Sequence, residues 1–174
     1  MYAVLWSAAG GFGDPLERDP AKVEADIDNG DVSAMAARDV YGVVLGDAAA
    51  TERRRAELRI RRLQGHTGER KLRKLEGAPR FLATDSLAVH ANKHFGCVKC
   101  GQDLGPVGLN YKDHCVRNDL PIEASNPIVG DPRRFIDPLT QFRQFCCPSC
   151  GLLIENEIAV SDDPVLRDVE IFSR

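Results

Sequence analysis

Two short cysteine motifs of the same form contain the candidate metal-binding or reactive side chains of this sequence. Cys97-Val-Lys-Cys100 and Cys147-Pro-Ser-Cys150 are each followed by a glycine, and 46 residues separate them. Two residues between thiolates let one tight turn direct both sulfurs at one ion, and the glycine tolerates the positive φ that ends such a turn. The set Cys97, Cys100, Cys147 and Cys150 therefore predicts a tetrahedral, structural zinc site.

Other uses of these cysteines remain open at this point. An iron–sulfur cluster also takes four thiolates, a redox pair prefers a helix N-terminus in a βαβ context, and free thiols or disulfides are further alternatives. Both motifs lie among runs typical of strands, which favours zinc. Cys146 would break the match between the two motifs if it replaced Cys147, so we expect it to be a small buried hydrophobe. Cys115 and its neighbour His114 belong to no second spaced set.

Motifs for catalysis are missing from the sequence. It contains no phosphate-binding G-x-x-x-x-G-K-[ST] loop, no G-x-S-x-G nucleophile turn and no H-E-x-x-H zinc motif. The glycine cluster at 10–13 is weak evidence for phosphate binding by itself. We therefore predict no catalytic and no cofactor-binding residues in this chain, and a non-catalytic role.

The charge of the chain is unevenly distributed. Residues 52–80 hold eleven basic and four acidic residues, a local charge of +7, whereas the remainder carries −10. A basic stretch beside a four-cysteine site is the pattern of a nucleic-acid-binding zinc ribbon, which is the alternative function. The acidic remainder would repel phosphate, so we expect a protein partner and no nucleic acid. The absence of a long apolar run and of a basic N-terminal region predicts a cytoplasmic protein without membrane contact.

The order of elements predicts an α+β protein with two modules. We expect strands at 2–8 and 41–45, and helices at 20–29, 34–39 and 48–64 that are capped by Asp19, Ser33 and Asp47. Glycine, proline and charge then cluster, and short β-like runs follow. The predicted organisation is a small αβ module at 1–64, a basic linker at 65–80 and a β-rich, zinc-ribbon-like module at 81–174.

Two segments resemble parts of known families. The run Gly10-Gly-Phe-Gly-Asp-Pro-Leu-Glu-Arg-Asp-Pro20, followed by Val32-Ser33 and Tyr41-Gly-Val-Val-Leu45, resembles the C-terminal end of hydantoinase B-type proteins over about 8–60. Residues 81–174 resemble the small gamma-type subunit of acetone carboxylase, on the two cysteine pairs and on Gln144-Phe-Cys-Cys-Pro-Ser-Cys-Gly-Leu-Leu-Ile154.

Together these resemblances imply a zinc-bearing structural subunit of an ATP-dependent ketone carboxylase, and the acetophenone carboxylase type is the most similar. In such enzymes a ketone, bicarbonate and ATP give a 3-oxo acid. The implied partners are hydantoinase A-like and B-like large subunits in a hetero-oligomer. ATP and Mg²⁺ or Mn²⁺ are expected on those partners, and only Zn²⁺ on this chain.

Overall fold

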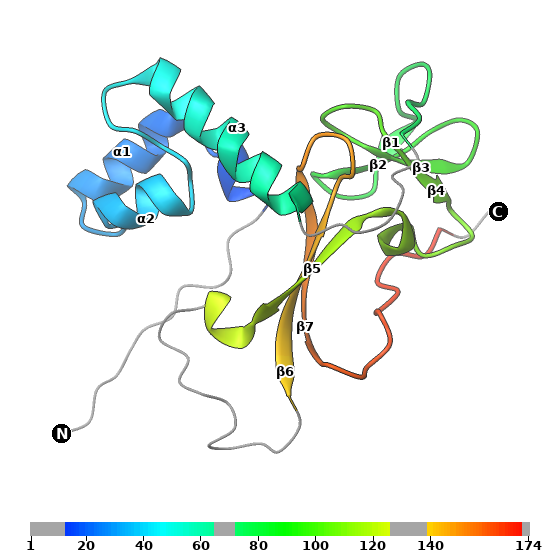
Figure 1. Ribbon diagram of the computed structural model, residues 1–174. Coiled ribbons are helices and arrows are strands. Elements are labelled where there is room, and N and C mark those ends of the chain that lie inside the picture. The colour runs from blue at the N-terminus through cyan, green and yellow to red at the C-terminus, as the bar shows by residue number, and fades with distance from the viewer. Residues whose placement is uncertain (1–12, 65–71, 126–138, 172–174) are drawn as a thin grey trace. The chain divides into compact units, whose positions relative to one another are not determined.

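The computed structural model describes residues 13–64, 72–125 and 139–171 (Figure 1). The chain divides into two compact units, Met1–Arg55 and Ala56–Arg174. The described secondary structure of the first unit is helical, and the second unit contains two antiparallel sheets, so the predicted α+β class is confirmed. The strand predicted at 2–8 lies outside the described residues. None of the described helices is long and apolar enough to cross a bilayer.

The three predicted helices are present, and their starts are set by the predicted caps. They are α1 (Pro20–Asp28), α2 (Ala34–Asp39) and α3 (Ala48–Gln64), after a short 3₁₀ turn, η1 (Pro15–Glu17). The carboxylate of Asp19 accepts from the N–H of Ala21, the hydroxyl of Ser33 from Ala36, and the carboxylate of Asp47 from Ala50. Each cap satisfies an N–H group that the first helical turn leaves unpaired.

The strand predicted at 41–45 is wrong, because this segment is a loop. The N–H of Val43 donates to the carbonyl of Ala37 at 2.8 Å, which continues the bonding of the end of α2. The hydroxyl of Thr51 accepts from the N–H of Val44 and donates to its carbonyl. These backbone groups are satisfied by helices, so the apolar run has no need of a sheet.

Arg55 is the buried polar residue that links the loops of the first unit. Its Nε donates to the carbonyl of Tyr41 at 3.1 Å, and its Nη2 donates to the carbonyl of Arg18 at 2.5 Å. Val23 and Val43 are buried beside Ala37 in the small apolar core of this unit. One guanidinium therefore joins the turn before α1 to the loop after α2.

The second unit contains a four-stranded and a three-stranded sheet. The first has the order β1 (Phe81–Leu82), β2 (Leu87–Val89), β3 (His94–Cys97) and β4 (Asp103–Pro106). The second has the order β5 (Val116–Pro121), β6 (Thr140–Cys146) and β7 (Leu153–Val160), and these strands run side by side in Figure 1. The short 3₁₀ turns η2 (Tyr111–His114) and η3 (Ile122–Ala124) flank β5.

One apolar core joins the two sheets. Phe95 and Leu104 of the first sheet are fully buried in the same cluster as Phe145 and Ile154 of the second. Tyr111 of η2 packs edge-on against Phe95, with ring centroids 5.6 Å apart. The side chains that face this core alternate with residues of the opposite face, as the period of a strand requires.

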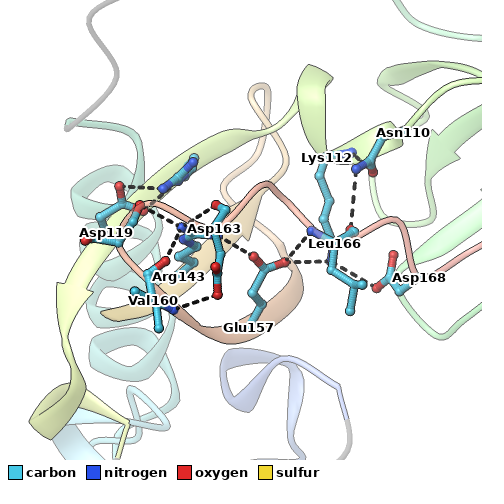
Figure 2. Close-up of polar contacts among 11 residues, drawn as sticks. Asn110, Lys112, Asp119, Arg143, Glu157, Val160, Asp163, Leu166 and Asp168 are labelled. Carbon is cyan, nitrogen blue, oxygen red and sulfur yellow. Dashed lines mark hydrogen bonds and ion pairs between the residues drawn. The ribbon is translucent and has the colours of Figure 1, made fainter. Parts of the chain in front are cut away.

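Residues 161–171 have no regular secondary structure and are fixed to the second sheet by charged groups (Figure 2). The guanidinium of Arg143 is 0% exposed, and its Nη1 contacts the carboxylate of Glu157 at 2.7 Å. Its Nη2 donates to the carbonyls of Val160, Ser161 and Asp163 at 2.9, 3.0 and 2.9 Å. This one side chain therefore holds the turn at the end of β7.

Lys112 completes the cluster from η2. Its Nζ lies 3.2 Å from Glu157 and 3.2 Å from Asp168, and its side chain is 1% exposed. The same ammonium lies 5.1 Å from the centre of the Phe145 ring. The hydroxyl of Tyr111 donates to Asp168 at 3.1 Å. Two buried cations thus depend on Glu157, which contacts both.

We predict that Glu157→Gln destabilises the second unit by about 3 kcal/mol, because it leaves two buried cations without their shared counter-charge. Glu170→Gln is the matched control, since Glu170 forms an exposed pair with Arg167. Its expected cost is under about 0.5 kcal/mol. Urea unfolding of the full chain measures both. Equal costs for the two variants would refute the role of Glu157.

The stability of the unit should also depend on pH through Glu157. Burial acts to raise the pKa of this carboxyl, but hydrogen bonds from Arg143 and Lys112 outweigh it and lower the pKa. A lowered pKa in the folded state stabilises the fold above the unfolded value of about 4.3, and this contribution is lost as the pH falls further. Glu157→Gln should remove that part of the acid dependence.

Candidate metal centre

Each cysteine motif forms the turn between two neighbouring antiparallel strands. The first knuckle, residues 97–101, follows the end of β3 and precedes β4. The second knuckle, residues 147–151, lies between β6 and β7. One knuckle therefore belongs to each sheet, and both are next to the core that joins the sheets.

The two knuckles share one hydrogen-bond pattern. In the first, the N–H of Gly101 donates to the carbonyl of Cys97 at 2.8 Å, and the N–H of Cys97 donates to the carbonyl of Gln102 at 2.9 Å. In the second, Gly151 and Leu152 make the equivalent bonds with Cys147, at 2.9 and 2.8 Å. The two motifs thus fold by the same local rule.

Both knuckles also share a glycine with positive φ and a backbone N–H group that bonds to a cysteine sulfur. Gly101 and Gly151 have φ of 71° and 70°, the left-handed region predicted from their position after each motif. The backbone N–H of Gln102 bonds to the sulfur of Cys100, and that of Leu152 bonds to the sulfur of Cys150. Such N–H groups disperse negative charge from a thiolate.

The structure brings all four predicted sulfurs together. The Sγ atoms of Cys97 and Cys150 are 3.7 Å apart, and those of Cys100 and Cys147 are 3.6 Å apart. All four ligand atoms lie within 4.8 Å of one another. A tetrahedral ion with bonds of about 2.3 Å would separate its sulfurs by about 3.8 Å. A disulfide would need about 2.05 Å, so these distances match metal ligands and exclude a disulfide.

The electrostatics of the cluster favour a cation. Hydrogen bonding to Cys100 raises the pKa of the Cys97 and Cys147 thiols, and burial raises both further. The hydrogen bond from Cys147 in turn lowers the pKa of Cys100. Four thiolates this close would in addition repel one another, so protons stay on some sulfurs. A divalent cation would take the place of those protons.

The second knuckle is packed against the C-terminal half of α3. A Cβ atom on Gly151 would lie 2.7 Å from the carbonyl oxygen of Arg59, so only glycine fits there without displacing the helix backbone. Nη1 of Arg62 donates to the carbonyl of Gly151 at 3.0 Å. No local sequence pattern predicts this contact, because 89 residues separate Arg62 from Gly151.

The first knuckle is braced by a segment that sequence reasoning did not assign to the site. The N–H of Leu75 donates to the carbonyl of Gly101 at 2.8 Å, and the N–H of Asp103 donates to the carbonyl of Arg73 at 2.7 Å. Residues 73–75 therefore pair with the chain just after Cys100. Lys74 and Gln102 form an isolated antiparallel β-bridge, which no sequence pattern predicts.

Asp103 fixes the hairpin that carries the first knuckle. Its carboxylate accepts from Nδ1 of His94 and from the N–H of Gly105, each at 2.9 Å. Burial acts to raise the pKa of Asp103, but the hydrogen bonds from His94 and Gly105 lower it overall. His90 and His94 lie on either side of the turn between β2 and β3, where the N–H of His90 donates to the carbonyl of His94 at 2.9 Å.

The remaining cysteines lie outside the group of four sulfurs. Cys146 is buried beside Val116 and Leu153, as expected for a small hydrophobe. Cys115 is buried, its thiol donates to the carbonyl of Tyr111 at 3.5 Å, and burial raises the pKa of the thiol. Neither belongs to a group of potential metal ligands within the described ranges.

Several arginines of the basic stretch make internal contacts. Arg54 contacts Asp39 at 3.0 Å, while Arg55 and Arg62 donate to backbone carbonyls. Part of the charge that suggested nucleic-acid binding thus stabilises the chain's own loops. This leaves the four-cysteine centre as the feature with the most defined chemistry.

Two sheets that each supply a C-x-x-C-G knuckle to one group of four sulfurs define a small α+β protein with a cysteine cluster compatible with a zinc ribbon. The model of the acetone carboxylase gamma subunit family matches residues 82–172, which is more than half of the chain. The chain therefore belongs to the acetone carboxylase gamma subunit family. Among curated proteins no relative of the chain is found. Membership makes the chain a subunit of a multi-subunit carboxylase complex.

The contact between α3 and the second knuckle predicts unequal costs for two similar substitutions. Gly101→Ala should cost about 1–2 kcal/mol for the left-handed backbone alone, because its Cβ would meet its nearest neighbour at 3.7 Å. Gly151→Ala should cost about 1–3 kcal/mol more, since the backbone of α3 must also shift. Thermal unfolding of the two full-length variants measures the difference. Equal melting temperatures would contradict this packing.

Proposed function

We propose that Cys97, Cys100, Cys147 and Cys150 hold one structural Zn²⁺. The spacing of the sulfurs, 3.7 Å between Cys97 and Cys150 and 3.6 Å between Cys100 and Cys147, supports this ligand set. Four thiolates close the coordination shell and leave no position for water or substrate, which is the arrangement of a structural rather than a catalytic zinc site. Zinc here stabilises the fold, because a unit with a small core gains folding energy from the metal.

Cys→Ser at any of these four positions should release the ion and loosen residues 90–155. Cys146→Ser is the matched control, because Cys146 is buried next to the site without belonging to it. Elemental analysis of the purified complex should give about one zinc per chain for the wild type and the control, and almost none for the ligand variants. Iron in place of zinc, or a normal zinc content in Cys147→Ser, would refute the proposal.

We infer further that the chain is a zinc-bearing small subunit of an ATP-dependent ketone carboxylase of the acetophenone carboxylase type. The observation that carries this inference is the family membership of residues 82–172. The resemblance of about 8–60 to the end of hydantoinase B-type proteins supports the acetophenone type. The contacts of Arg55 with Arg18 and Tyr41 are consistent with a preserved module, since they join the two runs that carry this resemblance.

We propose the following division of labour within the complex. Residues 1–64 form the hydantoinase B-like module, 65–80 a basic linker and 81–174 the zinc-bearing module. Hydantoinase A-like and B-like large subunits bind ATP and Mg²⁺ or Mn²⁺ and perform the carboxylation in the cytoplasm. The chain's own residues hold zinc, present surfaces for docking and supply no catalytic group.

Affinity purification of the tagged chain from its native cells tests this function. We expect stoichiometric recovery of two large subunits, and a complex that carboxylates an aryl or alkyl methyl ketone only when ATP and bicarbonate are both present. A chain that elutes as a stable monomer without partners would contradict the proposal. A strong, salt-dependent shift of DNA or RNA would instead favour the nucleic-acid-binding alternative.

A further inference from the structure

The two faces of the β5–β6–β7 sheet differ sharply in charge. All charged side chains of these strands lie on the face that contains Phe145 of the core, namely Arg117, Asp119, Arg143, Glu155 and Glu157. The opposite face is formed by cross-strand rows of uncharged residues: Val116, Cys146 and Leu153; Asn118, Gln144 and Asn156; Leu120, Phe142 and Ile158; Thr140 and Val160. In a chain in which 28% of residues are charged, a sheet face without charge requires an explanation.

A helix already covers one end of this uncharged face. Leu63 of α3 packs against the cluster of Val116, Cys146 and Leu153. The amide of Asn118 donates to the carbonyl of Arg62 at 3.0 Å, which secures the last turn of the helix on the next row. The face is therefore of a kind that accepts a helix.

The other end of the face contains an apolar row with an exposed member. Leu120 and Phe142 are half-buried, and Ile158 is 63% exposed. This row lies four residues along β6 from Cys146, or about 13 Å at the rise of a strand. Helices packed side by side are about 8–10 Å apart, so a second helix fits on this row beside α3.

We propose that the row Leu120–Phe142–Ile158 is the docking surface for an uncharged, apolar helix face of a large carboxylase subunit. Depletion of charge with retention of aromatic and aliphatic residues marks the centre of protein interfaces. In the neighbouring row Asn118 is bonded to α3, and Gln144 and Asn156 supply a polar border that can hydrogen-bond with the partner. This inference rests on the chain being a subunit of a carboxylase complex.

A matched pair of substitutions tests the docking surface. Ile158→Glu places a charge on the row, whereas Leu166→Glu is the control, because Leu166 is equally exposed at 62% but lies in the segment held by Arg143 and Lys112. The tagged variants are expressed in the native cells, and the large subunits recovered with each are quantified by mass spectrometry. We expect Ile158→Glu to lower recovery about tenfold, the effect of losing one interface anchor, and Leu166→Glu to leave it unchanged.

Two further measurements keep the outcome decisive. Ile158→Lys should weaken recovery as Ile158→Glu does, because burial disfavours a charge of either sign; loss with only one sign would indicate a charged partner surface and overturn the proposal. Zinc content and circular dichroism should match the wild type in all variants, which shows that the second unit is folded.

If the wild type recovers the large subunits and both Ile158 variants do so equally well, the docking surface is refuted while the proposed function stands. If the wild type recovers no partner, the proposed function itself fails. A variant that only breaks a dimer of this chain would identify a second copy as the occupant and overturn the proposal.

Discussion

Four sulfurs within 4.8 Å of one another are the constraint on which the second unit depends. Two of them come from each sheet, so the distance between the knuckles fixes how the sheets meet over their shared core. Four thiolates at this spacing repel one another, and only protons or a cation can relieve that repulsion. Holding the knuckles in place by backbone hydrogen bonds, by α3 and by residues 73–75 is therefore a large part of what the surrounding chain does.

Charge is sorted between the two faces of the second sheet. On the core side, Arg143 and Lys112 are buried with Glu157 and hold a C-terminal segment that has no strands or helices of its own. Buried charges are costly unless each is paired, and this cluster meets that condition through bonds to carbonyls as well as to carboxylates. The other face is left without charge. One face of this sheet therefore binds the chain's own C-terminal segment, and the other face carries an apolar row.

The second unit carries the features that the acetone carboxylase gamma subunit family shares with this chain. The gamma-family module brings together four cysteine sulfurs that could hold one metal ion, and the sequence contains none of the phosphate-loop, nucleophile-turn or H-E-x-x-H motifs. The helical first unit has a small core of its own around Val23, Ala37 and Val43. The family membership and the uncharged sheet face are the two observations that bear on how the chain joins a carboxylase complex.

The sequence alone determined the features that depend on neighbouring residues. The caps Asp19, Ser33 and Asp47 predicted the starts of three helices, and the glycines after each cysteine pair predicted two turns with positive φ, because these bonds span only a few residues. Tertiary structure decided the rest. The apolar run at 41–45 is a loop because Thr51 and Ala37 satisfy its backbone groups. Strand pairing and packing across tens of residues produce three further features: the contact of Arg62 with Gly151, the burial of Arg143 and the charge-free sheet face. Such contacts depend on which distant segments meet, and no local pattern encodes that choice.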